Sequence, residues 1–252
     1  MRKLLIMVCA IAAIAFSGCS VTQKAPVTGR TQLVLISAEQ EKQLGLSEAE
    51  NILKTSKLSS DRALTARVVS VGKRIVAAYP EAQGYEWSFY LLDDPTINAF
   101  ALPGGKVFFY TGILRLMAND DQIACVMGHE IAHVLARHGS ERMSQQMLSN
   151  AGSQALANAI GVPSKYQSLY ETAYGAASNL GVILPFSRKH ESEADAIGVS
   201  LMYKAGYNPN EAVRFWQTMA ANKGGATPEF LSTHPSDERR IKDIEGYIKN
   251  LK

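Results

Sequence analysis

The order of apolar and polar positions predicts mainly helices from residue 37 onward. Residues 37–54 begin with Ser37 and Gln40 in the positions of a capping box, which predicts a helix start. Residues 61–80 have a second helical pattern, which ends at Pro80 because proline interrupts a helix. Another helix is expected after Asn208, which precedes Pro209 and has Glu211 in the box position. A last helix is expected to begin near residue 236.

Two short segments have the pattern of strands instead. Residues 85–94 carry Trp87, Phe89 and Leu91 at alternate positions, and residues 106–112 form an apolar run after a Pro-Gly-Gly turn. The fold class predicted by this balance is α+β, with a mainly helical domain and a small β-sheet.

One helical segment, NDDQIACVMGHEIAHVLARH at residues 119–138, is apolar on nearly every face. Asn119 is a suitable N-cap, and two aspartates follow in the first turn. A helix that is apolar all round is typically buried. His129 and His133 are four residues apart and share one face, with Glu130 beside them. Burying such side chains is unfavourable unless they are satisfied, and a metal ion satisfies them directly.

The HEIAH sequence therefore has the H-E-x-x-H arrangement, in which two histidines hold zinc and the glutamate polarises a metal-bound water. The alternative is a chance match on a helix surface. A catalytic zinc usually has three protein ligands and one open position, so a ligand must come from elsewhere in the chain.

The third ligand does not follow the short metzincin spacing, because that position is Gly139 and His138 misses it by one residue. Further on, SRKHESEADAIG contains Glu191 and Asp195 four residues apart. Glu191 can bind the metal, and Asp195 can accept a hydrogen bond from a ligand histidine. The alternative is a solvated acidic face, an interpretation that suits Glu193 best. Gly206 can terminate this helix.

A family resemblance rests on HEIAH, SRKHESEADAIG and HPSDERR, together with PVTGRTQLVLIS and INAFALPGGKVFFYTGIL upstream. The chain resembles the gluzincin zinc endopeptidases of the HtpX type, and within them the periplasmic lipoprotein peptidases of the BepA and LoiP kind. The resemblance implies a zincin-type domain with its sheet beside the HExxH helix and one zinc ion per chain. The implied zinc ligands are His129, His133 and Glu191. The resemblance also implies that Glu130 is the catalytic base and that Asp195 accepts a hydrogen bond from a ligand histidine.

The same resemblance gives roles to residues near the C-terminus. His234 and Arg240 match a histidine and an arginine that follow the third ligand in the family, and either can stabilise the oxyanion. The alternative for Arg240 is a solvent-exposed position, together with Arg239, at the end of a helix. His234 can instead occupy the fourth zinc position as a gate, which we favour, or serve as an ordinary loop histidine. His190 is a weak rival ligand.

The first eighteen residues predict a signal peptide, since a basic start precedes an apolar run too short to span a bilayer. The FSGC sequence resembles a lipoprotein cleavage box, so Cys19 would be lipidated. By family analogy, Ser20 favours the outer membrane. Residues 19–36 would then be a lipidated segment and residues 37–252 a single metallopeptidase domain. Residues 140–185 predict a helical hairpin insertion, although a mobile lid or an assembly surface is equally compatible.

The charge and the cysteines narrow the function further. The net charge is +3, and removing residues 1–18 with Arg2 and Lys3 leaves +1, which argues against nucleic-acid binding. Of the three cysteines, Cys9 leaves with the leader and Cys19 carries lipid. Cys125 then remains alone, an inert core thiol without a disulfide partner.

These observations predict a periplasmic zinc metalloendopeptidase that is anchored through Cys19 and degrades misfolded or unassembled envelope proteins. Outer-membrane assembly or protease components are the expected partners. The alternative is a zinc-binding envelope chaperone or assembly factor with little proteolysis, but such a protein would not need Glu130. We also expect Val107–Tyr110 to be an exposed strand edge that adds an extended peptide. The expected borders of that cleft are Asn98, Ala99, Gly104 and Gly105.

Overall fold

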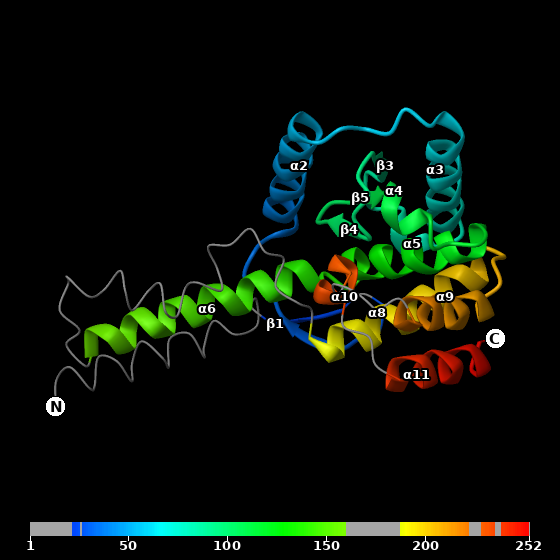
Figure 1. Ribbon diagram of the computed structural model, residues 1–252. Helices are drawn as coiled ribbons and strands as arrows, with labels where there is room; N and C mark the ends of the chain where they lie inside the picture. The colour runs from blue at the N-terminus through cyan, green and yellow to red at the C-terminus, as the bar shows by residue number, and fades with distance from the viewer. Residues whose placement is uncertain (1–21, 26, 160–186, 222–227, 235–237, 252) are drawn as a thin grey trace.

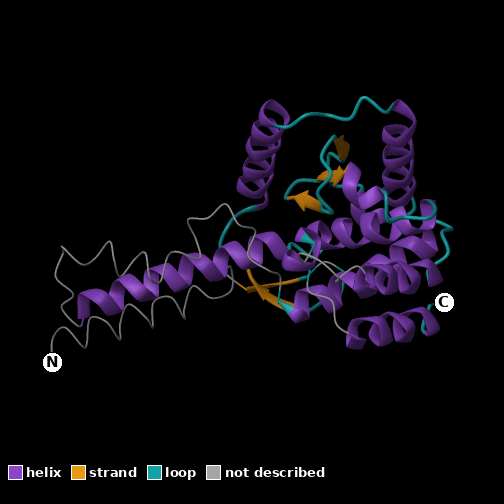
Figure 2. Cartoon of the chain, viewed as in Figure 1, coloured by secondary structure: helices purple, strands orange, loops and turns teal. Residues whose placement is uncertain are grey.

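The structure is a computed structural model that describes residues 22–25, 27–159, 187–221, 228–234 and 238–251. The predicted signal peptide, Cys19 and residues 160–186 lie outside the described residues. The described part is mainly helical with two small sheets, which confirms the predicted α+β class (Figure 2). Among the described helices, none combines the length and apolar character needed to cross a bilayer.

The described strands are β1 (Thr22–Lys24), β2 (Thr31–Leu33), β3 (Ser88–Leu92), β4 (Ala99–Leu102) and β5 (Lys106–Tyr110). The described α-helices are α2 (Ala38–Thr55), α3 (Arg62–Ala77), α4 (Thr111–Leu114), α5 (Asp120–Leu135), α6 (His138–Ala159), α8 (Arg188–Lys204), α9 (Asn210–Ala221), α10 (Glu229–Thr233) and α11 (Glu238–Lys249). A short 3-10 turn occupies Pro80–Ala82, where the predicted helix stop falls.

The larger sheet has the order β3-β5-β4, with β5 parallel to β3 and antiparallel to β4. The prediction that Val107–Tyr110 forms an exposed edge was wrong, because β5 is the central strand and both of its edges are paired. The free edge beside α5 belongs to β4. The four residues of β4 are all apolar, and such a short uniform run carries no alternating signal.

Helix α5 lies between the larger sheet and helices α8 and α9 (Figure 1). Every residue from Gln122 to Leu135 is buried, as the apolar pattern predicted. The Asn119 cap is confirmed, because its side chain accepts a hydrogen bond from the Gln122 backbone at 3.0 Å. Helix α3 packs on one side against β3 and α5, while α8 and α9 pack against α5 from below.

The predicted capping box at Ser37 is present, with Ser37 and Gln40 bonded in both directions. The box expected between Asn208 and Glu211 does not form, because the Asn208 backbone donates to Asp121 Oδ1 at 2.9 Å and the Asn208 side chain accepts from the Asn210 backbone at 3.1 Å. Glu211 instead accepts a hydrogen bond from Gln122 Nε2 at 2.9 Å, which ties α9 to the start of α5. Gly206 follows α8 with φ of 72°, which confirms it as the helix terminator.

The antiparallel hairpin of β1 and β2 packs against the beginning of α6. The Leu35 backbone also donates to Ser144 on α6 at 2.8 Å. The hairpin lies upstream of residue 37, where the sequence predicts the domain to begin, and it packs against the helical part of the chain. Helix α6 projects away from the rest of the molecule and supplies the first part of the predicted insertion (Figure 1).

Candidate metal centre

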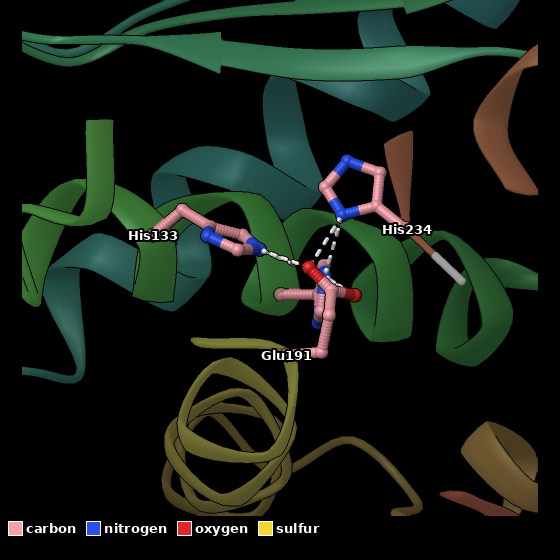
Figure 3. Close-up of side chains that lie close together, drawn as sticks. His133, Glu191 and His234 are labelled. Carbon is pink, nitrogen blue, oxygen red and sulfur yellow. Dashed lines mark hydrogen bonds and ion pairs between the residues drawn. The ribbon is translucent and has the colours of Figure 1, made fainter. Parts of the chain in front are cut away.

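Four buried side chains converge between α5, α8 and α10. His129 and His133 come from α5, Glu191 from the first turn of α8, and His234 from the end of α10. One ligand atom of each lies within 4.8 Å of the others. His129 Nε2 is 3.0 Å from His133 Nε2 and 3.1 Å from His234 Nδ1. Figure 3 shows His133, Glu191 and His234 pointing toward one another, with Glu191 Oε1 3.1 Å from His234 Nδ1.

Two glycines allow α5 and α8 to approach closely enough for this convergence. A Cβ atom on Gly128 would lie 3.0 Å from the Gly198 carbonyl oxygen, and one on Gly198 would lie 3.0 Å from the His129 nitrogen. Those separations are tighter than ordinary van der Waals contact. The bare backbones at this crossing therefore bring Glu191 and Asp195 up to the histidines of α5.

The convergent atoms fit a bound divalent cation. Asp195 Oδ1 lies 2.9 Å from His129 Nδ1, so that nitrogen carries a proton and the Nε2 lone pair of a neutral His129 faces the centre. Several such lone pairs at about 3 Å require a proton or a metal between them. Burial lowers the pKa of His129, but Glu191 and Asp195 outweigh it and raise the pKa to about 9 without a metal, so a proton then takes the place that a cation would occupy. Three imidazoles and a carboxylate are ligands that zinc prefers.

Glu130 lies beside this group and faces a cleft of about 310 Å³. Its Oε1 atom makes no hydrogen bond within the described residues and is 3.5 Å from His234 Nε2. Burial raises the pKa of Glu130, which brings the carboxylate closer to the range of an effective general base. The cleft lining also includes His133, Ala101 and the apolar side chain of Met143.

The free edge of β4 forms one wall of the cleft. Tyr110 on β5 donates its backbone N–H to Asn98, which fixes the direction of the ladder. Backbone groups alternate in an antiparallel pair, so those of Ala99 and Ala101 point away from β5; Ala101 lines the cleft, whereas Ala99 is fully buried and does not. Glu130 accepts a backbone hydrogen bond from Ala101. Gly104 and Gly105 lie in the turn after β4 with positive φ and do not line this cleft.

Arg240 lies behind the ligands rather than in the cleft lining. Its guanidinium donates two hydrogen bonds to Asp195, at 2.7 and 2.8 Å, and is 2.8 Å from Glu191 Oε2. It also stacks 3.6 Å above the Trp216 ring. Burial raises the pKa of Asp195, but Arg240 and His129 outweigh it, so the carboxylate stays ionised. The solvated position considered for Arg240 does not occur, whereas Arg239 is exposed.

A second buried polar cluster adjoins the first, and sequence reasoning missed it. Glu193 is buried and accepts hydrogen bonds from His138 and Arg30, so its assignment to a solvated face was wrong. His190 is bonded to Glu141 at 3.1 Å and lies outside the group of four convergent ligands. The sequence signals for this cluster were His138, which looked like a misplaced metzincin ligand, and His190, which was considered a weak rival ligand.

Comparison with known proteins agrees with this geometry. The model of peptidase family M48 matches residues 62–248 of the chain. The mitochondrial metalloendopeptidase OMA1 of Saccharomyces cerevisiae is 34% identical, over 94% of this chain and 73% of that protein. The OMA1 of Schizosaccharomyces pombe is 35% identical, over 88% of this chain and 65% of that protein. The beta-barrel assembly-enhancing protease of Escherichia coli is 30% identical, over 90% of this chain and 47% of that protein.

Proposed function

Because the chain belongs to peptidase family M48 and is a zinc metalloendopeptidase, we propose that it degrades unfolded or misassembled proteins of the cell envelope. The name of the Escherichia coli relative and the predicted lipoprotein leader support an envelope location. The OMA1 relatives are mitochondrial by name, so the fungal proteins support the peptidase chemistry and not the compartment.

We assign zinc binding to His129, His133 and Glu191. Zinc supplies Lewis-acid chemistry when bound, polarising a carbonyl and acidifying water. Glu130 accepts the proton of the attacking water at its carboxylate and later delivers that proton to the departing amine. Among the described residues, none donates a hydrogen bond to Glu130 Oε1, so this atom is available for the transfer.

Three further residues control the site in this proposal. Asp195 and Arg240 hold His129 and Glu191 in place, because Arg240 is bonded to both carboxylates and does not line the cleft. His234 acts as a gate: turned inward, as here, its Nδ1 atom occupies a ligand position beside Glu191. Turned outward, the same imidazole is free to donate to the oxyanion.

We propose that the substrate binds as an added strand on β4. The outward carbonyl of Ala101, which lines the cleft, can accept a backbone hydrogen bond from an extended peptide and carry the scissile bond past Glu130. Backbone pairing selects for an extended conformation rather than a sequence, which suits unfolded clients. A bound peptidic inhibitor that avoided β4 would contradict this arrangement.

The observation that supports the peptidase assignment most strongly is the convergence of four buried ligand atoms beside Glu130 and an open cleft. The test incubates the purified chain, beginning after Cys19, with an unfolded protein and with its folded form. We expect zinc-dependent cleavage of the unfolded protein only, lost with a chelator and restored by zinc. Client binding that suppresses aggregation without cleavage would favour the chaperone alternative.

The envelope assignment has a separate test. We expect the wild-type protein in the outer-membrane fraction and Cys19→Ala in the soluble periplasm, because the acyl chains hold the domain on the membrane. The proposed partners are outer-membrane assembly or protease components, captured by cross-linking with the Glu130→Gln variant. A wild-type protein found wholly in the soluble fraction would contradict the lipid anchor.

A further inference from the structure

The second buried cluster forms a hydrogen-bonded chain that starts at a zinc ligand. His133 Nδ1 lies 2.9 Å from His138 Nδ1, and His138 Nε2 lies 3.0 Å from Glu193 Oε2. Arg30 Nε donates to the same carboxylate oxygen at 2.5 Å, and the Thr28 hydroxyl donates to Oε1. The chain thus runs from α5 through α6 and α8 to the hairpin of β1 and β2.

A break in the helix brings His138 to His133. Residues five apart on a continuous α-helix lie about 140° apart around its axis and cannot bond side to side. Arg137 interrupts the helix between α5 and α6 with φ of 56°, a left-handed conformation that a non-glycine residue rarely adopts. Its side chain is held by Glu41 and by the Ile36 carbonyl. The surrounding structure therefore maintains this turn.

The groups at the two ends of this hydrogen-bonded chain determine which atom donates in each hydrogen bond. His133 presents Nε2 to the metal centre, so its Nδ1 carries the proton and donates it. His138 then accepts at Nδ1 and donates from Nε2 to Glu193. Glu193 accepts hydrogen bonds from His138 and Thr28, and its carboxylate forms an ion pair with the Arg30 guanidinium. The chain therefore ends on an ionised acceptor.

We propose that His138, held by Glu193 and Arg30, is a positioning residue that orients His133 and sets the zinc affinity of the site. The proposal rests on the proposed function, in which His133 is a zinc ligand. It makes the N-terminal hairpin part of the metal centre, although that hairpin is about a hundred residues away in sequence. Partners of this kind around a metal ligand typically change metal affinity or activity 10- to 100-fold.

A matched control exists in the same cluster. His190 stacks on His138 with ring centroids 4.5 Å apart and is bonded to Glu141, which Arg30 also binds. Replacing His190 disturbs the same buried cluster without removing a partner of His133. A purely structural role for the cluster predicts equal effects at His138 and His190, whereas positioning predicts an effect on zinc at His138 alone.

The experiment measures the zinc dissociation constant of each apoprotein by competition with a chromophoric chelator, and records the absorption spectrum of the cobalt form. We expect His138→Phe to bind zinc about 10- to 100-fold more weakly, with an altered cobalt spectrum. His138→Asn, whose amide oxygen can accept in place of Nδ1, should recover most of that affinity. His190→Phe should stay within about threefold of the wild type.

Equal dissociation constants for His138→Phe and His190→Phe would overturn the proposal, as would the absence of rescue in His138→Asn. If His138→Phe does not fold, Glu193→Gln keeps the shape of the cluster, and we expect it to weaken zinc binding several-fold; an unchanged constant would overturn the proposal. Zinc binding and proteolysis by the wild type test the proposed function separately. If the wild type neither bound zinc nor cleaved protein, the proposed function would be rejected on that result alone, without comparing any variant.

Discussion

His129 and His133, the two histidines that α5 contributes to the metal centre, are supported in different ways. His129 faces a carboxylate directly, since Asp195 Oδ1 lies 2.9 Å from its Nδ1 and is clamped by Arg240. His133 faces another imidazole, that of His138. A negative partner favours a positive charge on the ligand histidine, whereas an imidazole supplies only a hydrogen-bond acceptor.

The difference also concerns where the supporting residues come from. The partners of His129 lie on α8 and α11, close to the third ligand Glu191 in space. The hydrogen-bonded chain that starts at His133 ends at Arg30, which lies in the hairpin of β1 and β2. We therefore expect the support of His129 to have the larger effect on zinc, and the support of His133 to link the metal to the N-terminal hairpin.

The largest expected effect is on the His129 side. Asp195→Asn removes the carboxylate beside His129 and leaves Arg240 with Glu191 as its remaining anionic partner. We expect zinc affinity to fall about 100-fold and the free energy of unfolding to fall by about 3 kcal/mol. Chelator competition and urea unfolding measure the two quantities. If this variant lost less zinc affinity than His138→Phe, the ranking of the two supports would be reversed.

Arg240→Lys separates a positioning role from contact with substrate. The variant keeps the charge but loses the paired hydrogen bonds to Asp195 and the stacking on Trp216. A positioning role predicts that kcat and zinc affinity both fall, by about tenfold each. A loss of kcat with unchanged zinc affinity would instead make Arg240 a direct donor to the oxyanion.

Both supports depend on the crossing of α5 and α8, so Gly198→Ala should weaken them together. The added methyl group meets the backbone of His129 and Gly128 at 3.0 and 3.1 Å, which forces the helices apart. We expect a loss of about 1–3 kcal/mol in the free energy of unfolding and weaker zinc binding. Gly246→Ala on α11 is the control, because its Cβ would meet no atom within 4 Å, and it should be neutral or slightly stabilising.

The smallest expected effect concerns acid stability on the His133 side. The pKa of Glu193 is lowered from the ordinary 4.5 to about 2, so its ionised form stabilises the fold above pH 4.5. That contribution is lost as the pH falls from about 4.5 to 2, where the carboxylate takes up a proton. Glu193→Gln should therefore lose about 1 kcal/mol less stability than the wild type over this range, measured by denaturant unfolding. Parallel curves for the two proteins would contradict the ion pair with Arg30.

Local signals were sufficient for much of the fold, for His129 and His133, and for the Glu191 and Asp195 pair, whereas His234 was identified through the family resemblance. The Asn119 cap, the Ser37 box and the buried α5 were predicted because each depends on neighbours within one or two turns. The Glu191 and Asp195 pair was found because both residues lie on one face of a single helix.

Contacts that depend on tertiary placement were not predictable in this way. The sequence could not identify β4 as the edge strand, since strand order is a property of the folded sheet. Glu193 resembles a surface residue until Arg30, far away in sequence, is placed beside it. His138 reaches His133 only because Arg137 breaks the helix. No local sequence pattern indicated that Arg137 would adopt the left-handed backbone conformation.

The central claim is that α5 and α8 form one zinc site in which Glu130 accepts the proton of the attacking water and delivers it to the departing amine. The most direct test is a single experiment on Glu130→Gln: metal analysis of the purified protein together with its turnover of an unfolded substrate. We predict one zinc ion per chain, as in the wild type, and a rate lower by about 10²-fold or more. Full activity in this variant, or a wild-type protein that holds no zinc at the four convergent side chains, would contradict the account.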